Sequence, residues 1–177
     1  MGWAFGWDTR EQLVNHLLND SNHDLIASKS TCYGRRLWAV FRPTWEGRNS
    51  DEPFICLFLL EDGGRRDGWG YKDVTESMGP CEYDCPLDLL DLAPPPKGGL
   101  AEEWAARWRQ KVREYHAARC RKYTVGDRVT IYGKTYQVTG KVRRSYLVRR
   151  MHGDGSTSGP QYRTTAAKMQ PAPEVLQ

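Results

Sequence analysis

The chain has 177 residues, 39% of them hydrophobic and 27% charged, and a formal net charge of +4. This length and apolar share predict one folded domain or a domain with a small extra module, and they exclude a disordered chain. The longest apolar run covers residues 54–60, too few to span a bilayer, and no basic segment leads into an apolar one near the start. We therefore expect a cytoplasmic protein with no membrane partner.

Charge is divided unevenly along the chain. Residues 1–100 hold ten Lys and Arg against sixteen Asp and Glu, whereas residues 101–177 hold sixteen against six. The basic part could meet nucleic acid or an acidic protein surface, or the two parts could attract each other. The five cysteines are an odd number, which fits reduced thiols better than a disulfide framework.

Residues 1–93 read as an α+β domain. A strand is expected over residues 1–7, and Thr9 and Gln12 offer a capping box for a helix to about Asn19. Further strands are expected over 26–33, 35–42 and 54–61, the last central in a small mixed or antiparallel sheet. A polar loop then leads into residues 70–80, which we also interpret as a loop, and Pro86 opens a short helix over 87–92.

Residues 94–99, with three prolines and two glycines, form the expected linker. A Trp-rich helix over 100–122 follows, with an apolar stripe predicted to be core, comprising Leu100, Trp104, Trp108, Val112 and Tyr115. The two tryptophans one turn apart could instead form an exposed stacking platform. Residues 123–170 alternate in short stretches with tight turns, which suggests a small basic β-barrel of SH3-like type, and residues 171–177 are expected to be a flexible tail.

The predicted partner-binding residues lie in this barrel: Lys141, Arg143, Arg144, Tyr146, Arg149 and Arg150. Arginine can bind phosphate through two hydrogen bonds while an aromatic ring stacks on a base, as in proteins that bind single strands or RNA. A solvated strand face, or a patch that docks on an acidic surface, is the structural alternative.

The other candidate site is the segment 70–85. Tyr71, Lys72, Asp73 and Glu76 could be acid, base or positioning groups of an enzyme acting on a nucleotide or nucleic acid, or could cap a turn. Cys81, Cys85, His116 and Cys120 are weak zinc candidates, because their spacing is not that of a zinc knuckle and nothing in the sequence joins the two pairs. No cofactor motif occurs, so we expect no cofactor and no metal.

The stretch from Gly70 to Pro80, GYKDVTESMGP, followed by Cys85-Pro86, resembles a family of uncharacterised bacterial proteins carried by phages, prophages and plasmids. The likeness extends to the opening Met1-Gly2-Trp3-Ala4-Phe5 and to a later helix with Trp108-Arg109 and Cys120. The resemblance implies no activity. It implies an accessory protein of a mobile element, which binds nucleic acid or a protein partner and could counter host defence.

Overall fold

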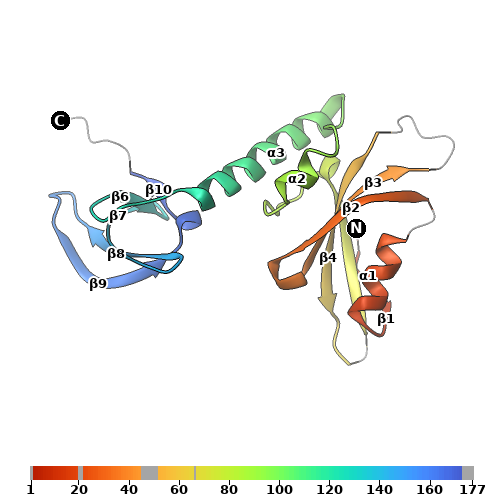
Figure 1. Ribbon diagram of the computed structural model, residues 1–177, viewed down its shortest axis with the longest axis horizontal. Coiled ribbons are helices and arrows are strands. Elements are labelled where there is room, and N and C mark those ends of the chain that lie inside the picture. The colour runs from red at the N-terminus through yellow and green to blue at the C-terminus, as the bar shows by residue number, and fades with distance from the viewer. Residues whose placement is uncertain (1, 20–21, 45–51, 66, 173–177) are drawn as a thin grey trace. The chain divides into compact units, whose positions relative to one another are not determined.

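The computed structural model describes residues 2–19, 22–44, 52–65 and 67–172 (Figure 1). The chain forms two compact units, Met1–Val112 and Arg113–Gln177, each built on a five-stranded antiparallel sheet. The α+β class predicted from the sequence is confirmed. No helix in the described part of the chain has the length and apolarity needed to cross a membrane.

The N-terminal unit contains the first five strands and the helices that cover their sheet: β1 (Ala4–Trp7), α1 (Arg10–Leu18), β2 (His23–Thr31), β3 (Arg36–Pro43), β4 (Phe54–Asp62), β5 (Trp69–Thr75), α2 (Leu87–Leu90) and the first part of α3 (Gly99–Cys120). The strand order is β1-β5-β4-β3-β2, so β4 is central, as predicted. The capping box that starts α1 is also present, with the side chains of Thr9 and Gln12 each bonded to the other residue's backbone amide.

Helices cover both faces of this sheet, because side chains alternate along each strand. On one face, Leu37 of β3 and Phe58 of β4 pack with Leu13 and Leu17 of α1. On the other face, Trp38 of β3 packs with residues of α2 and α3, in a cluster of Val40, Ile55, Leu57, Leu89, Leu90, Trp108 and Val112. Figure 1 shows α1 and α2 on opposite sides of the strands.

One expectation for this unit was wrong, because residues 70–75 belong to strand β5 rather than to a loop, and only residues 76–78 form a short 3₁₀ turn, η2. The predicted stripe of α3 is confirmed at Trp108 and Val112, which are buried in the core. It is wrong at Leu100 and Trp104, which are exposed, and Tyr115 is half-buried. Ala105 and Arg109 are also buried.

The division between the units falls inside α3, at Val112 and Arg113, rather than at residues 94–99 where the sequence places a linker. Packing explains the difference. Trp108 and Val112 are buried in the core of the N-terminal unit, so the helix that follows the linker belongs to that core for most of its length.

The C-terminal unit contains strands β6 (Arg128–Ile131), β7 (Lys134–Val142), β8 (Ser145–Met151), β9 (Thr157–Thr164) and β10 (Gln170–Pro171), in the order β10-β6-β7-β8-β9. Val129, Val138, Tyr146, Val148 and Met169 form its core. The strand pairs join one open sheet with β9 and β10 at its edges, so the predicted closed barrel is not confirmed. Pro171, placed in the tail by the sequence, lies in β10, and residues 173–177 of that tail fall outside the described residues.

Candidate nucleic-acid interface

Strand pairing gathers arginines on the face of the C-terminal sheet that points away from its core. Arg128 on β6 pairs with Gln137 on β7, and Gln137 pairs with Arg149 on β8. Arg149 follows the buried Val148, so it points to the opposite face, and Arg163 on β9 pairs with Leu147 on that same face. Adjacent strands lie about 4.8 Å apart, so Arg128 and Arg149 stand roughly 10 Å apart. Of the three, only Arg149 was predicted.

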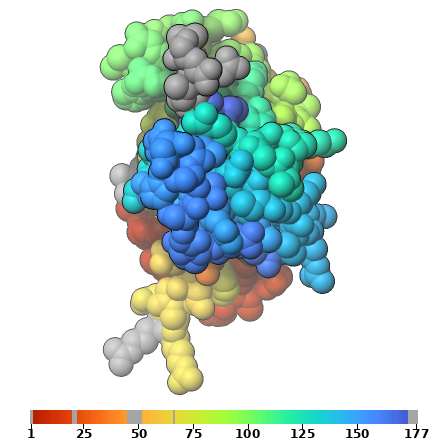
Figure 2. Space-filling model, turned by 90° about the vertical axis from the view of Figure 1, so that its left-hand side faces the viewer, coloured from red at the N-terminus to blue at the C-terminus, as the bar shows by residue number. Residues whose placement is uncertain are grey.

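The turn between β7 and β8 adds a second group of cations. Lys141 precedes the turn, and Arg143 and Arg144 form its two-residue tip, where Arg143 has a φ of 54°. All three side chains are exposed. In the space-filling view of Figure 2, the light-blue segment near residue 145 projects from the surface of this unit. These three predicted residues therefore lie together.

The acidic residues of this sheet do not neutralise its cations. Residues 123–172, all described, contain nine Lys and Arg and only two acids, Asp127 and Asp154. Asp127 accepts hydrogen bonds from the backbone amide and hydroxyl of Thr124, both at 2.8 Å. Hydrogen bonds from the side chain and backbone of Ser156 lower the pKa of Asp154. Within these described residues no Lys or Arg forms an ion pair. The exposed cations of residues 123–172 therefore have no carboxylate partner in the described part of the chain.

Tyr146 is not available for stacking. Its ring is buried in the core, its hydroxyl accepts a hydrogen bond from the Tyr123 amide (3.2 Å), and the Lys141 ammonium lies 5.6 Å from its centroid. Two other tyrosines of this unit, Tyr132 and Tyr162, are exposed. The ring of Tyr162 meets that of Tyr136 edge to face (6.4 Å), and the guanidinium of the predicted Arg150 lies 6.0 Å from the centroid of the Tyr136 ring.

The proposed catalytic group does not converge. In β5, Tyr71 pairs with Leu60 and Asp73 with Phe58, so both point to the α1 face, whereas Lys72 pairs with Leu59 and points to the opposite face. Strand alternation therefore separates Lys72 from its two neighbours. Tyr71 packs against the rings of Trp7 and Phe58.

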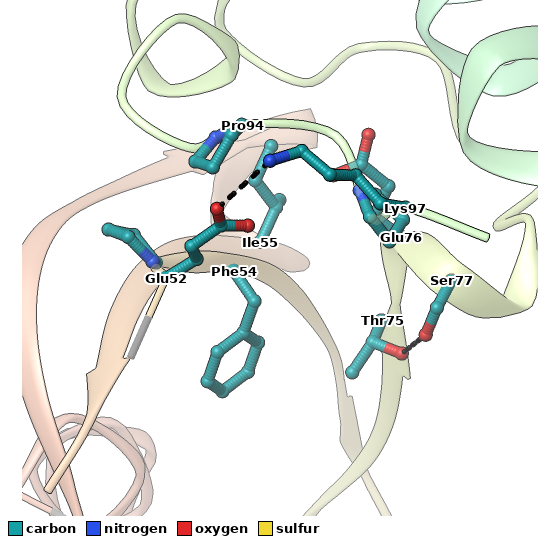
Figure 3. Close-up of a pocket in the computed structure, with 10 residues that line it drawn as sticks. Glu52, Phe54, Ile55, Thr75, Glu76, Ser77, Pro94 and Lys97 are labelled. Atoms are coloured by element: carbon teal, nitrogen blue, oxygen red, sulfur yellow. Dashed lines mark hydrogen bonds and ion pairs between the residues drawn. The ribbon is translucent and has the colours of Figure 1, made fainter. Parts of the chain in front are cut away.

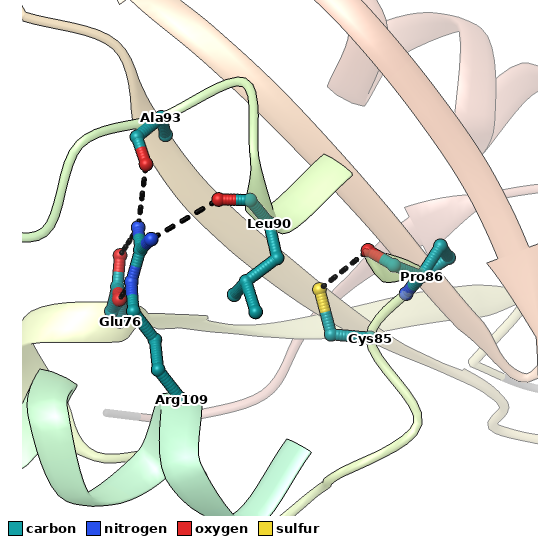
Figure 4. Close-up of polar contacts among 6 residues, drawn as sticks. All are labelled: Glu76, Cys85, Pro86, Leu90, Ala93 and Arg109. Carbon is teal, nitrogen blue, oxygen red and sulfur yellow. Dashed lines mark hydrogen bonds and ion pairs between the residues drawn. The ribbon is translucent and has the colours of Figure 1, made fainter. Parts of the chain in front are cut away.

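Glu76 has a partner in the protein interior. It is 4% exposed and forms a two-point ion pair with Arg109 of α3, which is 7% exposed. The same guanidinium donates to the carbonyl oxygens of Leu90 (3.1 Å) and Ala93 (2.7 Å), as Figure 4 shows. This cluster, the Glu76–Arg109 clasp, ties η2, the end of α2 and α3 together. Glu76 is thus an architectural residue.

The pockets of the N-terminal unit agree with this separation. One pocket of about 510 Å³ lies beside Phe54, Thr75 and Ser77, with an ion pair between Glu52 and Lys97 (3.3 Å) at its edge (Figure 3). A different pocket, of about 540 Å³, holds Tyr71 and Asp73 on the α1 face with His16 and His23. Neither pocket contains Lys72.

The thiols and the histidine proposed for zinc are not gathered at one place. Within the described part of the chain, no group of three or more His, Cys, Asp or Glu side chains could hold a metal ion. Cys81 and Cys120 are exposed, whereas Cys85 is buried and burial, followed by the charge of Glu76, raises its pKa to about 12. Burial also raises the pKa of Cys56.

No protein-family model matches the chain, and neither a curated protein nor a solved structure matches it.

Proposed function

We propose that the C-terminal unit binds nucleic acid through the outward face of its sheet, with phosphates held by Arg128, Arg149 and Arg163 and by the turn residues Lys141, Arg143 and Arg144. The observation that carries the proposal is the separation of charge within residues 123–172, where no Lys or Arg is paired with a carboxylate and the two acids, Asp127 and Asp154, bond to residues of their own turns. Arginine is the side chain best suited to bind phosphate oxygens with two parallel hydrogen bonds.

The order of the strands supports a compact binding module. Four strands follow one another as a meander, and the fifth returns beside the first after a short 3₁₀ turn, η3 (Ala166–Lys168). This is the order of SH3-like barrels, so we propose that the unit is an incompletely closed barrel of that kind. We further propose that the protein acts as an accessory factor of a mobile element, in line with the resemblance of residues 70–86.

The test is a binding titration of the full chain with a labelled single-stranded 15-mer, a duplex 15-mer and an RNA 15-mer between 50 and 300 mM salt. The test variant reverses the three outward arginines: Arg128→Glu, Arg149→Glu and Arg163→Glu. We expect its affinity at 50 mM salt to fall at least about 100-fold, and the slope of log K against log salt to lose about two units.

The matched control reverses three exposed arginines of the N-terminal unit: Arg35→Glu, Arg42→Glu and Arg65→Glu. This control changes the net charge by the same amount as the test variant does. It therefore distinguishes binding at the outward face from nonspecific attraction to the net charge. The affinity of this control for the three probes should stay within about threefold of that of the unchanged protein. Equal losses in both variants, or no binding of any of the three probes at 50 mM salt, would overturn the proposal, and the second result would assign the face to an acidic protein.

A further inference from the structure

A second candidate site lies in the N-terminal unit, where residues 78–83 face α3. Arg107 and Trp108 follow Trp104 by three and four positions, and Lys111 follows it by seven, so the four residues share one side of the helix. Together with Met78 and Tyr83 they line a pocket of about 230 Å³. This volume is below the roughly 300–1,000 Å³ of ordinary ligand sites, so the pocket suits one planar ring system whose substituents remain at the surface.

The walls of the pocket are fixed from behind. The indole nitrogen of Trp108 donates to the carbonyl oxygen of Glu82 (2.8 Å), and its ring stacks on Trp38 with 5.8 Å between centroids. The facing segment packs on α3 at Gly79, which has a φ of 61° and where a Cβ would be in ordinary contact with the Trp104 Cβ, at 3.5 Å. The Glu76–Arg109 clasp holds the same segment against α3. The pocket is therefore already formed without a ligand.

The surface inside the pocket is aromatic and partly exposed. Trp104 is 41% exposed although it lies one turn from Trp108, which is 3% exposed. Tyr83 and Met78 across the groove are also exposed. An aromatic face that the core leaves accessible is suited to stacking, because a flat ring can cover it without repacking the interior.

The charged groups of the pocket are both cations. Arg107 and Lys111 lie one and two turns from Trp104, and no carboxylate is among the residues that line the pocket. If a ring covers Trp104, an anionic group attached to that ring would lie near the side chains of Arg107 and Lys111 on the same side of α3. The complementary ligand combines a flat ring with a nearby anionic group.

We propose that this pocket binds a nucleotide, free or at the end of a single strand, with the base against Trp104 and the phosphate at Arg107 and Lys111. A nucleotide joins both features, a flat ring and an anion, in one small molecule. The site belongs to the N-terminal unit, and it does not depend on the basic face of the C-terminal unit.

The experiment titrates the full chain with adenosine monophosphate, adenosine, inorganic phosphate and a deoxyadenosine tetranucleotide, followed by calorimetry. We expect adenosine monophosphate to bind at least tenfold more tightly than adenosine or phosphate, because ring and anion act together. Trp104→Ala and Arg107→Glu should each weaken it at least fivefold. A tetranucleotide that binds tenfold more tightly than adenosine monophosphate would identify a strand end as the source of the nucleotide.

Two controls separate this site from others. Trp3→Ala removes another half-exposed tryptophan, 44% exposed, which lies beside Arg35 and Arg36 but also beside Glu61 and Asp62, and should leave binding unchanged. The variant with the three reversed outward arginines should also bind adenosine monophosphate normally, so failure of one site is distinguishable from failure of the other.

Three results would overturn the proposal: no binding of adenosine monophosphate or the tetranucleotide at millimolar concentration, equal effects of Trp104→Ala and Trp3→Ala, or binding of an acidic tyrosine-containing peptide in place of both nucleotides. Circular dichroism of each variant checks that folding is retained. Trp104 is accessible in the folded protein, so its removal is not expected to unfold the unit.

Discussion

The two units use their charged residues in opposite ways. In the N-terminal unit the polar motif turns inward, so that Glu76 meets Arg109 in the interior. In residues 123–172 the outward arginines Arg128, Arg149 and Arg163 are exposed, and the two carboxylates, Asp127 and Asp154, bond to residues of their own turns. A run rich in charged residues can therefore serve either the fold or a partner, and burial distinguishes the two uses.

Motif residues of the opening segment, of residues 70–80 and of α3 contact one another in the N-terminal unit. Phe5 of the opening segment pairs across strands with Gly70 of the GYKD stretch, and Glu76 of the ESMGP stretch binds Arg109 of the Trp-Arg pair. Trp108 is bonded to Glu82 in the same region. These motif residues therefore take part in assembling the N-terminal unit.

Breaking the Glu76–Arg109 clasp should have the largest effect on stability. We expect Arg109→Ala to lower the free energy of unfolding by about 3–5 kcal/mol, because it leaves the Glu76 carboxylate buried without a partner. Urea unfolding measures the change. Replacing both residues by Met should recover most of the loss, and Lys29→Ala, which breaks an exposed ion pair with Asp88, should change stability little. A small effect of Arg109→Ala would contradict the architectural role of Glu76.

The reactivity of the thiols provides a second comparison of buried and exposed groups. Burial raises the pKa of Cys85 to about 12, so at pH 8 it has about a thousandfold less thiolate than a free thiol. We expect iodoacetamide to label Cys32, Cys81 and Cys120 rapidly and Cys56 and Cys85 only in urea. Peptide mass spectrometry identifies the sites. Because the pKa is raised, the stability that the protonated Cys85 thiol contributes is full below about pH 9 and is lost toward pH 12. Rapid labelling of Cys85 at pH 8 would count against its burial.

A substitution at Gly70 tests the packing of strand β1 against strand β5. A Cβ at this position would lie 2.3 Å from the Phe5 ring and 2.6 Å from the Ala4 carbonyl oxygen. We expect Gly70→Ala to cost roughly 1–3 kcal/mol in the free energy of unfolding, because a backbone atom cannot move as a side chain can. Gly2→Ala, which meets nothing within 4 Å, is the control and should be neutral. Equal stability of both variants would mean that β1 does not pack as described.

The smallest expected effect concerns the outward face. Arg128→Glu alone should weaken binding of the single-stranded 15-mer about three- to tenfold and lower the salt slope by about one unit, if Arg128 contacts one phosphate beside Arg149. Arg42→Glu, on an exposed position of β3, should have no effect on either quantity. A loss caused by Arg42→Glu, or none caused by Arg128→Glu, would show that position on the sheet does not matter.

Much of the fold could be predicted because its signals are local. The capping box of Thr9 and Gln12, the apolar run of β4 and the alternation of β7 and β8 each lie within a few residues, and all four elements, α1 included, formed close to where they were expected. The strand character of residues 70–75 was missed because Gly70 and Asp73 are unusual in strands, and here the neighbouring strands β1 and β4 decide the conformation.

The candidate site was predictable only in part, for the same reason. Arg143, Arg144 and Arg149 are close in the sequence and were found, but Arg128 and Arg163 lie on other strands and join them only through pairing. Tyr146 and Glu76 were selected for their chemistry, yet both are buried. No local pattern predicts burial of a polar residue, because it depends on a partner distant in the chain.

The sequence by itself determined the two-part charge distribution, the α+β class and most element positions, since these follow from composition and from periodicity within single elements. Only the tertiary structure decided that Trp104 is exposed while Trp108 is buried, that Glu76 and Arg109 form an interior pair, and that three arginines from three strands share one face. The physical reason is that hydrogen bonding between strands and packing of helices on sheets join residues that the chain keeps far apart.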